Sequence, residues 1–256
     1  MSKSIADVQR EFAYADEQMR ALLYDLYAED SRTGVVKLIE KYRKQDEKLE
    51  AEKKRIENMS IYERKYDDFQ AICGIDEVGR GPLAGPVVAG AVILPKNCDI
   101  LYLNDSKKLS EKMRESLYEE IMEKAVATGI GIVSPARIDE INILQATYEA
   151  MRIAIGNLKV KPDLLLNDAV TIPEVKIRQV PIIKGDAKSV SIAAASIIAK
   201  VTRDRLMVQY EEVLPGYDFA SNKGYGSAVH IRAIQTIGAT PIHRQSFIKN
   251  FETVQS

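Results

Sequence analysis

The chain has 256 residues, of which 46% are hydrophobic and 29% charged, an ordinary globular composition with room for one domain and an appendage. Its 36 basic and 37 acidic residues nearly cancel, so it lacks the overall basic charge that many nucleic-acid-binding proteins carry. Two cysteines are too few for a disulfide framework, and two histidines argue against a His-rich zinc site or a His-based triad. No compact apolar signal opens the chain, and the apolar run 87–94 is too short to span a bilayer, so we expect a cytoplasmic protein.

The first seventy residues predict a helical hairpin. Apolar residues recur at alternating steps of three and four along 4–29, behind a Ser4–Asp7 capping pair, which predicts one helix. Residues 30–34 break this helix, and a weaker apolar stripe predicts a second one over 35–59. We therefore expect an N-terminal helical extension over 1–70.

Three roles are open for this extension. Its basic residues could contact a nucleic-acid backbone. The acidic residues between them favour an ordinary solvated surface, which is the interpretation we prefer. Homodimerisation through the first apolar stripe is the third role. The basic residues in question are Lys41, Arg43, Lys44, Lys53, Lys54 and Arg55.

From residue 71 onward, strands alternate with helices. The predicted strands are 72–75, 87–94, 129–133, 163–168 and 175–183. The predicted helices are 110–127, 138–158, 189–213, 229–237 and 242–254. Five strands interleaved with helices, the first two joined by a short loop, predict an α/β domain over 71–256 whose mixed sheet is covered by helices.

Three acidic residues, Asp76, Asp168 and Asp186, each follow an apolar strand. Ligands of α/β sheets bind at strand ends, so these carboxylates converge if the strands are neighbours. Their mutual repulsion then calls for divalent cations, and oxygen ligands without His or Cys favour Mg²⁺ or Mn²⁺. Two such ions could hold the attacking water and the leaving oxygen of a phosphodiester. The alternative is a helix cap or turn residue, especially for Asp186.

A glycine loop follows the first acidic residue. Gly79 and Gly81 flank Arg80, so the backbone can take positive φ angles and approach a ligand closely. Asp76 and Glu77 point to opposite faces of a regular strand, so both can bind one ion only if the strand breaks near Gly79. A metal-assisted phosphate site is predicted; an acidic strand end in water is the alternative.

The segment 76–88, DEVGRGPLAGPVV, resembles the opening motif of the bacterial type 2 ribonucleases H (ribonuclease HII). The similarity continues through 105–110, 166–168, 184–186, 191–204, 224–226 and 243–247. It covers about 71–251 and leaves the extension unexplained. The related type 3 enzymes carry a lysine in the loop, so Arg80 and the helical extension favour type 2.

The resemblance implies a ribonuclease H-like fold with a five-stranded mixed sheet. It implies a hydrolase that cuts the RNA strand of RNA–DNA hybrids and incises duplex DNA at embedded ribonucleotides. The implied two-metal-ion mechanism uses Mg²⁺ or Mn²⁺ and leaves 5′-phosphate and 3′-hydroxyl ends. The expected partners are hybrids and ribonucleotide-containing duplex DNA, with no membrane and no organic cofactor, and the protein is expected to be a monomer.

The family's catalytic, metal-binding residues correspond to Asp76, Glu77, Asp168 and Asp186 in this sequence. Among these residues we choose Asp76 as the ligand that bridges both ions, whereas Asp168 and Asp186 would each hold one. Asp204 lies in mid-helix, and we interpret it as a salt-bridge partner of nearby arginines.

The resemblance also implies substrate contacts. The loop of Gly79, Arg80 and Gly81 reads the ribose 2′-hydroxyl, the group that separates RNA from DNA. Tyr225 lies at the RNA-to-DNA junction, although a tyrosine between two glycines could also serve as a packing lid.

Four further residues are candidate phosphate contacts from their positions. Lys107 and Lys108 follow Asp105-Ser106 and could hold a phosphate, with ordinary surface lysines as the alternative. Ser189 and Ser191 open a helix whose free amides attract phosphate.

Two other functions remain open at this stage. A non-catalytic hybrid-binding protein could keep the glycine loop, but the four acidic residues are intact. A DNA-specific nuclease of the same superfamily would cut an all-DNA duplex as readily as one with a single ribonucleotide.

Overall fold

The computed structural model describes residues 3–251. The chain divides into two compact units, Met1–Glu57 and Asn58–Ser256, which we describe separately. The domain boundary at residue 70 stays a prediction.

The N-terminal unit contains α1 (Ile5–Tyr14), α2 (Glu17–Leu26) and most of α3 (Thr33–Met59). The single helix predicted over 4–29 was wrong, because the chain is extended at Ala15 and Asp16 caps α2, accepting the Met19 N–H at 2.8 Å. Phe12 stacks on Tyr42 with ring centroids 5.1 Å apart. The residues of this small core are Val8, Phe12, Leu23, Tyr27, Val35, Leu38 and Tyr42.

The break between α1 and α2 changes which residues are buried. Met19, Leu22 and Leu26 belong to the apolar stripe predicted to pack on another helix, but their exposed fractions are 50%, 62% and 66%. The stripe assumed one continuous helix, and the extended residues between α1 and α2 shift its phase.

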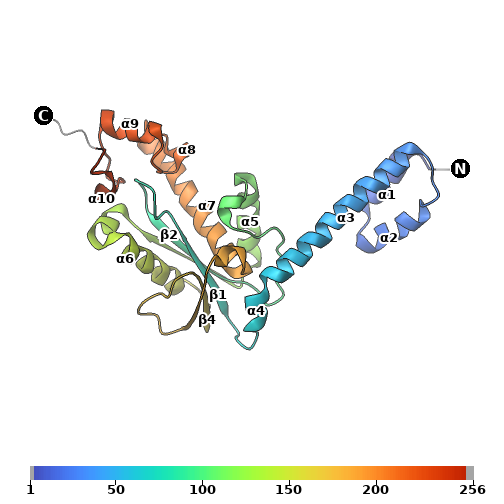
Figure 1. Ribbon diagram of the computed structural model, residues 1–256, viewed down its shortest axis with the longest axis horizontal. Helices are drawn as coiled ribbons and strands as arrows, with labels where there is room; N and C mark the ends of the chain where they lie inside the picture. Colours follow the sequence, from blue (N-terminus) through green and yellow to red (C-terminus); the bar gives the residue numbers. More distant parts are fainter. Residues whose placement is uncertain (1–2, 252–256) are drawn as a thin grey trace. The chain divides into compact units, whose positions relative to one another are not determined.

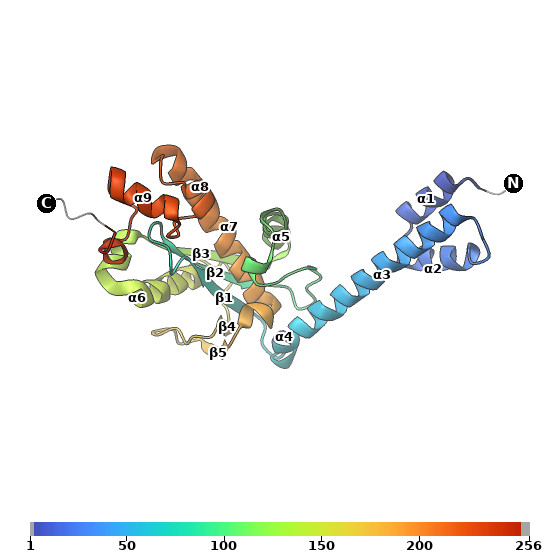
Figure 2. The same cartoon turned by 45° about the horizontal axis from the view of Figure 1, so that its top comes forward.

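The second unit is built on a five-stranded mixed sheet, as predicted. The strands are β1 (Ile72–Val78), β2 (Val87–Ile93), β3 (Ala127–Val133), β4 (Leu164–Asp168) and β5 (Arg178–Ile182). Their order is β3-β2-β1-β4-β5, with β1 central, antiparallel to β2 and parallel to β4 (Figures 1 and 2). The carboxyl ends of β1, β4 and β5 therefore lie at one edge of the sheet.

Two long helices cover the sheet, α6 (Pro135–Gly156) against β2 and β3, and α7 (Val190–Val213) against β1 and β2 (Figures 1 and 2). Glycine allows the close approach: a Cβ on Gly74 would lie 2.1 Å from the Ser191 carbonyl carbon in α7. A Cβ on Gly131 would lie 1.9 Å from the Ala150 oxygen in α6. Because side chains alternate along a strand, Asp76 shares the α7 side with Gly74.

Shorter elements surround the sheet. They are α4 (Ile61–Lys65), η1 (Ser106–Lys108), α5 (Glu111–Lys124), η2 (Gly185–Ala187), α8 (Phe219–Asn222), α9 (Ala228–Ile237) and α10 (Gln245–Ile248). The helix predicted over 242–254 is shorter than expected, and residues 252–254 lie outside the described part. Within residues 3–251, no helix combines the length and apolar character that a bilayer crossing needs.

Candidate active site

Three of the four predicted acidic residues meet at the carboxyl edge of the sheet. The register pairs Ile75 with Asn167, which puts Asp168 of β4 beside Asp76 of β1. Asp186 lies in η2, just beyond β5, and Gly185 donates its N–H to Asp168 Oδ1 at 2.7 Å. The three carboxylates come together because their strands are neighbours.

These carboxylates destabilise one another's charge. Asp76 is 6% exposed, and its pKa is raised well above the usual value by burial and then by the charges of Glu77 and Asp168. Burial, followed by the charges of Asp105 and Asp168, raises the pKa of Asp186, although Lys107 opposes this effect. Nearby cations would stabilise the charged forms of Asp76 and Asp186 and so lower both pKa values.

A cleft of about 510 Å³ opens beside these groups. Its lining includes Asp105, Lys108, Asp168, Lys184 and Asp186. Asp105 belongs to the segment 105–110 that resembles the family but is absent from the predicted site; it caps η1 by accepting the Lys107 N–H at 2.9 Å. The sequence signal that could have identified it is its place in the polar segment Asn104-Asp105-Ser106-Lys107-Lys108.

The donor set fits a divalent metal ion in its chemistry. The groups are carboxylate oxygens, the ligands that Mg²⁺ and Mn²⁺ prefer, and their combined charge is only partly compensated. Within residues 3–251, however, no three acidic, His or Cys side chains are gathered tightly enough to hold an ion. A cation bound at this edge would have to draw these side chains closer together.

Glu77 follows Asp76 in β1, and its charge interacts with those of Asp76 and Asp168. Asp76 and Glu77 were expected to bind one ion only if the strand breaks next to them. Instead, β1 continues to Val78, and Gly79 turns the chain only afterwards, at φ 87°. The Glu77 carboxylate pairs with Arg80 at 3.2 Å. Burial raises the pKa of Glu77, whereas Arg80 lowers it. Its role as a metal ligand stays a prediction.

Two buried arginines, absent from the predicted site, hold the glycine loop. Arg244 donates from Nε to the Gly85 carbonyl at 3.0 Å and from Nη1 to the Arg80 carbonyl at 2.8 Å, and it also contacts the Gly79 carbonyl. Arg203 of α7 donates to the carbonyls of Pro86, Lys223 and Ala84 at 2.8–3.0 Å. Gly79 makes room for this support, since a Cβ there would lie 2.3 Å from Arg203 Nε.

Tyr225 lies next to the glycine loop, as the predicted substrate site requires. Its ring has Arg203 Cζ 6.0 Å from the centroid, and its Cε1 would be 3.9 Å from a Cβ on Gly81. The loops are joined by the Leu83 N–H, which donates to the Gly224 carbonyl at 2.8 Å. The Tyr225 residue is 42% exposed, so its ring is partly open to solvent.

The four candidate phosphate contacts divide into two pairs. Lys107 and Lys108 are exposed beside the carboxylates, so phosphate contact and ordinary surface lysines both stay open. Ser189 and Ser191 are buried, and Glu63 of α4 already accepts the Ser189 hydroxyl at 2.6 Å and the Ser191 N–H at 3.1 Å. The structure contradicts phosphate contact at these serines, because a carboxylate from a distant segment occupies this helix end.

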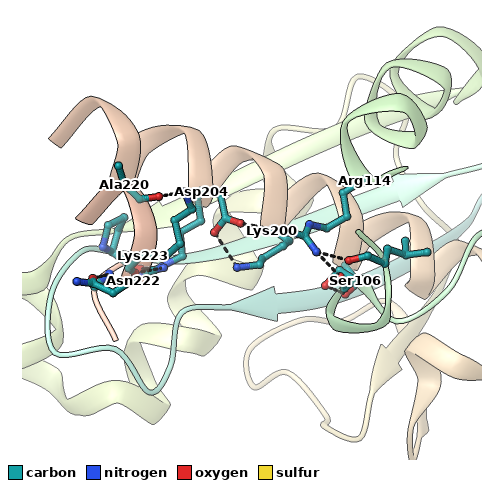
Figure 3. Close-up of polar contacts among 12 residues, drawn as sticks. Ser106, Arg114, Lys200, Asp204, Ala220, Asn222 and Lys223 are labelled. Atoms are coloured by element: carbon teal, nitrogen blue, oxygen red, sulfur yellow. Dashed lines mark hydrogen bonds and ion pairs between the residues drawn. The ribbon is translucent and has the colours of Figure 1, made fainter. Parts of the chain in front are cut away.

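Asp204 has the structural role predicted for it, although its main partner is a lysine. It accepts from Lys200 at 2.7 Å and lies 3.9 Å from Arg114 of α5 (Figure 3). Arg114 also donates to the Ser106 and Leu109 carbonyls, so this network joins α5, α7 and η1.

The basic residues of the N-terminal unit are only partly paired. Lys53 contacts Glu17 and Glu50, as expected of a solvated surface of mixed charge. Lys41 and Lys44 form no ion pair within the described residues and line a surface groove together with Lys37 and Lys48. The nucleic-acid role of this surface stays open.

The chain is similar to known proteins in sequence and in fold. The Ribonuclease HII family model matches residues 73–250, and the Ribonuclease HII N-terminal domain model matches residues 4–67. A ribonuclease HII of Lachnoclostridium phytofermentans is 65% identical over 250 residues, which is 98% of each chain. The ribonuclease H2 structure from Pyrococcus horikoshii has a TM-score of 0.60 and 28% identity, covering 72% of this chain and 97% of that one. A structure of the Bst ribonuclease HIII in complex with Mn²⁺ shares the fold, with a TM-score of 0.53 and 19% identity over 69% of this chain and 67% of that one.

Proposed function

The chain belongs to the ribonuclease HII family, and we propose that it cuts the RNA strand of RNA–DNA hybrids and incises duplex DNA at embedded ribonucleotides. The products carry 5′-phosphate and 3′-hydroxyl ends. The observation that carries this proposal is the meeting of Asp76, Asp168 and Asp186 beside a rigidly supported glycine loop.

Asp76, Asp168 and Asp186 would hold the metal ions, with Glu77 and Asp105 close by. Two Mg²⁺ or Mn²⁺ ions, when bound, would supply Lewis-acid stabilisation of charge on the phosphate and activate water for in-line attack. Asp168 has a second task, because its Oδ1 fixes the Gly185 N–H and so positions the turn that carries Asp186. The exposed Lys107 and Lys108 face the same region and are suited to binding the scissile strand's phosphates.

Selection for ribose would come from the glycine loop and Tyr225. Gly81 has no packing reason to be a glycine, since a Cβ there would have only Tyr225 Cε1 within 4 Å and its φ is not in the left-handed region. The space beside Gly81 has the Tyr225 ring as its neighbour, which suits a sugar edge bearing a 2′-hydroxyl. This favours ribose reading over a nuclease that acts on DNA alone.

The test compares a duplex with one ribonucleotide and an otherwise identical all-DNA duplex, each with Mg²⁺ and with Mn²⁺. We expect cleavage of the first only, and equal cutting of both would reject ribose reading. Asp168→Asn should abolish cleavage while sparing hybrid binding, because the amide oxygen can still accept from Gly185 but the charge is lost.

A readout besides activity tests the metal assignment. At a Mg²⁺ concentration of 100 times the dissociation constant, binding stabilises the folded protein by about 2.7 kcal/mol. This stabilisation should appear as a rise in melting temperature on addition of Mg²⁺. The rise should be present in the wild type and in the control Asp99→Asn, because Asp99 pairs with Lys124 on the surface, and it should be much reduced in Asp168→Asn. Unchanged cleavage and an unchanged Mg²⁺ response in Asp168→Asn would refute the assignment.

A further inference from the structure

The chain's two histidines are buried against each other and lie far along the sequence from Asp76, Asp168 and Asp186. His230 of α9 is 0% exposed and His243, before α10, is 2% exposed. Their Nε2 atoms are 3.0 Å apart. Tyr217 and Phe219 pack around the pair, with ring centroids 5.0–6.2 Å from the two imidazoles. Two such rings in an aromatic pocket need an explanation beyond filling space.

The hydrogen bonds at the two ends determine where the ring protons lie. The Thr240 amide donates to His243 Nδ1 at 2.9 Å, and an amide N–H can only donate, so this nitrogen carries no proton. The Thr240 hydroxyl, 2.8 Å from the same nitrogen, then acts as a donor too. At the other end, His230 Nδ1 lies 2.8 Å from the Tyr225 carbonyl oxygen, which can only accept, so His230 Nδ1 is protonated. With both rings neutral, one proton remains for the central contact, on His243 Nε2, and it is donated to His230 Nε2.

The result is a chain of hydrogen bonds with one direction, from Thr240 through both imidazoles to the backbone of Tyr225. Its satisfaction requires both rings to be neutral, because an added proton on either ring would set two N–H groups against each other. Burial lowers the pKa of both histidines, that of His243 to about 4, in agreement with neutral rings. No other arrangement of protons on two neutral rings satisfies all three contacts.

We propose that His230 and His243 are positioning residues that set the conformation of Tyr225 for reading the RNA-to-DNA junction. The Tyr225 carbonyl accepts from His230 and, at 2.8 Å, from the Ser227 N–H, so the backbone that carries the exposed ring is fixed from the interior. The preceding residue is fixed by Leu83, through the carbonyl of Gly224. The inference rests on the proposed junction role of Tyr225 and extends it to two residues that cannot touch the substrate.

The first experiment measures the ratio of kcat/KM on a single-ribonucleotide duplex to kcat/KM on a continuous RNA–DNA hybrid. Tyr225→Ala sets the reference for loss of junction reading. His230→Leu removes the donor to Tyr225 and should lower the ratio about tenfold, whereas His230→Asn, whose amide can replace Nδ1–H, should keep it within about threefold of wild type. In the double variant Tyr225→Ala/His230→Leu, the ratio should fall no further than in Tyr225→Ala alone, because His230 acts through that ring.

The outcomes separate the two claims. If Tyr225→Ala leaves the ratio unchanged, the junction role itself fails and the inference falls with it. If Tyr225→Ala lowers the ratio but His230→Leu does not, or if their effects add, the histidines do not act through Tyr225 and only the inference is overturned. A purely structural role would lower both kcat/KM values together and leave the ratio unchanged.

A second measurement needs no substitution. With ¹⁵N-labelled histidine, the two rings give a spectrum that reports which nitrogen carries each proton. We expect, at pH 7, His230 protonated on Nδ1 and His243 on Nε2, with both rings neutral. The opposite tautomer on either ring, or an imidazolium at this pH, would contradict the proposed chain of hydrogen bonds. This test holds even if His230→Leu does not fold.

Discussion

Arg244→Met tests whether the buried guanidinium holds the glycine loop in place. Arg244 is 0% exposed and serves the carbonyls of Gly79, Arg80 and Gly85. Removing the donors costs about 1–3 kcal/mol for each of the two buried contacts, those to Gly79 and Gly85, or about 2–6 kcal/mol in all, and less for the partly buried contact to the Arg80 carbonyl. Relief of a buried cation whose pKa is lowered to about 9 offsets part of this cost. We expect a net loss of about 2–4 kcal/mol, within the range seen when one partner of a buried network is removed.

Urea denaturation gives the free energy of unfolding directly, and a loss of about 2–4 kcal/mol should lower the melting temperature by about 4–16 °C for a chain of this size. Arg232→Met is the matched control, because Arg232 is an exposed residue of α9, and it should change stability by less than about 0.5 kcal/mol. The loosened loop should also lower kcat/KM on ribonucleotide-containing duplexes at temperatures where the variant is folded. A free energy of unfolding equal to that of the wild type would refute the reasoning, since the carbonyls would then not depend on the guanidinium.

Three further results are expected. Gly81→Ala should fold with wild-type stability, like the control Gly156→Ala, yet lose cleavage at ribonucleotides, because its Cβ enters the space assigned to the sugar. Circular dichroism melts measure the stability and the paired-duplex assay measures the cleavage, and unchanged cleavage would contradict the assignment. Folding lowers the pKa of His243 to about 4 from 6.5. The stabilisation from its neutral ring, at most about 3 kcal/mol, is therefore present above pH 6.5 and is lost as the pH falls toward 4. Over this pH range, the difference in free energy of unfolding between wild type and His243→Gln should shrink as the pH falls. If the surface of α3 contacts a phosphate backbone, Lys41→Ala/Lys44→Ala should weaken hybrid binding and reduce its salt dependence by up to about two units of slope, whereas unchanged binding would favour a solvated surface.

Local sequence signals were sufficient for the central sheet and the acidic edge. Apolar runs bounded by glycine and proline indicated β1, β2 and β4, and the position of Asp76 and Asp168 after such runs predicted where ligands bind. These signals are local because strand burial imposes its pattern on successive residues. The same kind of signal failed at Ala15 and Asp16, two extended residues that divide a helix whose apolar spacing looked continuous.

The supports of the site could be identified only from the tertiary structure. Nothing near Glu63 in the sequence shows that it occupies the start of α7, and nothing near Arg244 shows that it holds a loop 159–165 residues earlier. The two histidines looked unimportant because their number excluded familiar catalytic groups, yet their contact depends on α9 and the following loop folding over Tyr217 and Phe219. A buried polar group needs partners, but the sequence does not specify which distant carbonyl or carboxylate supplies them; the packing of elements decides this.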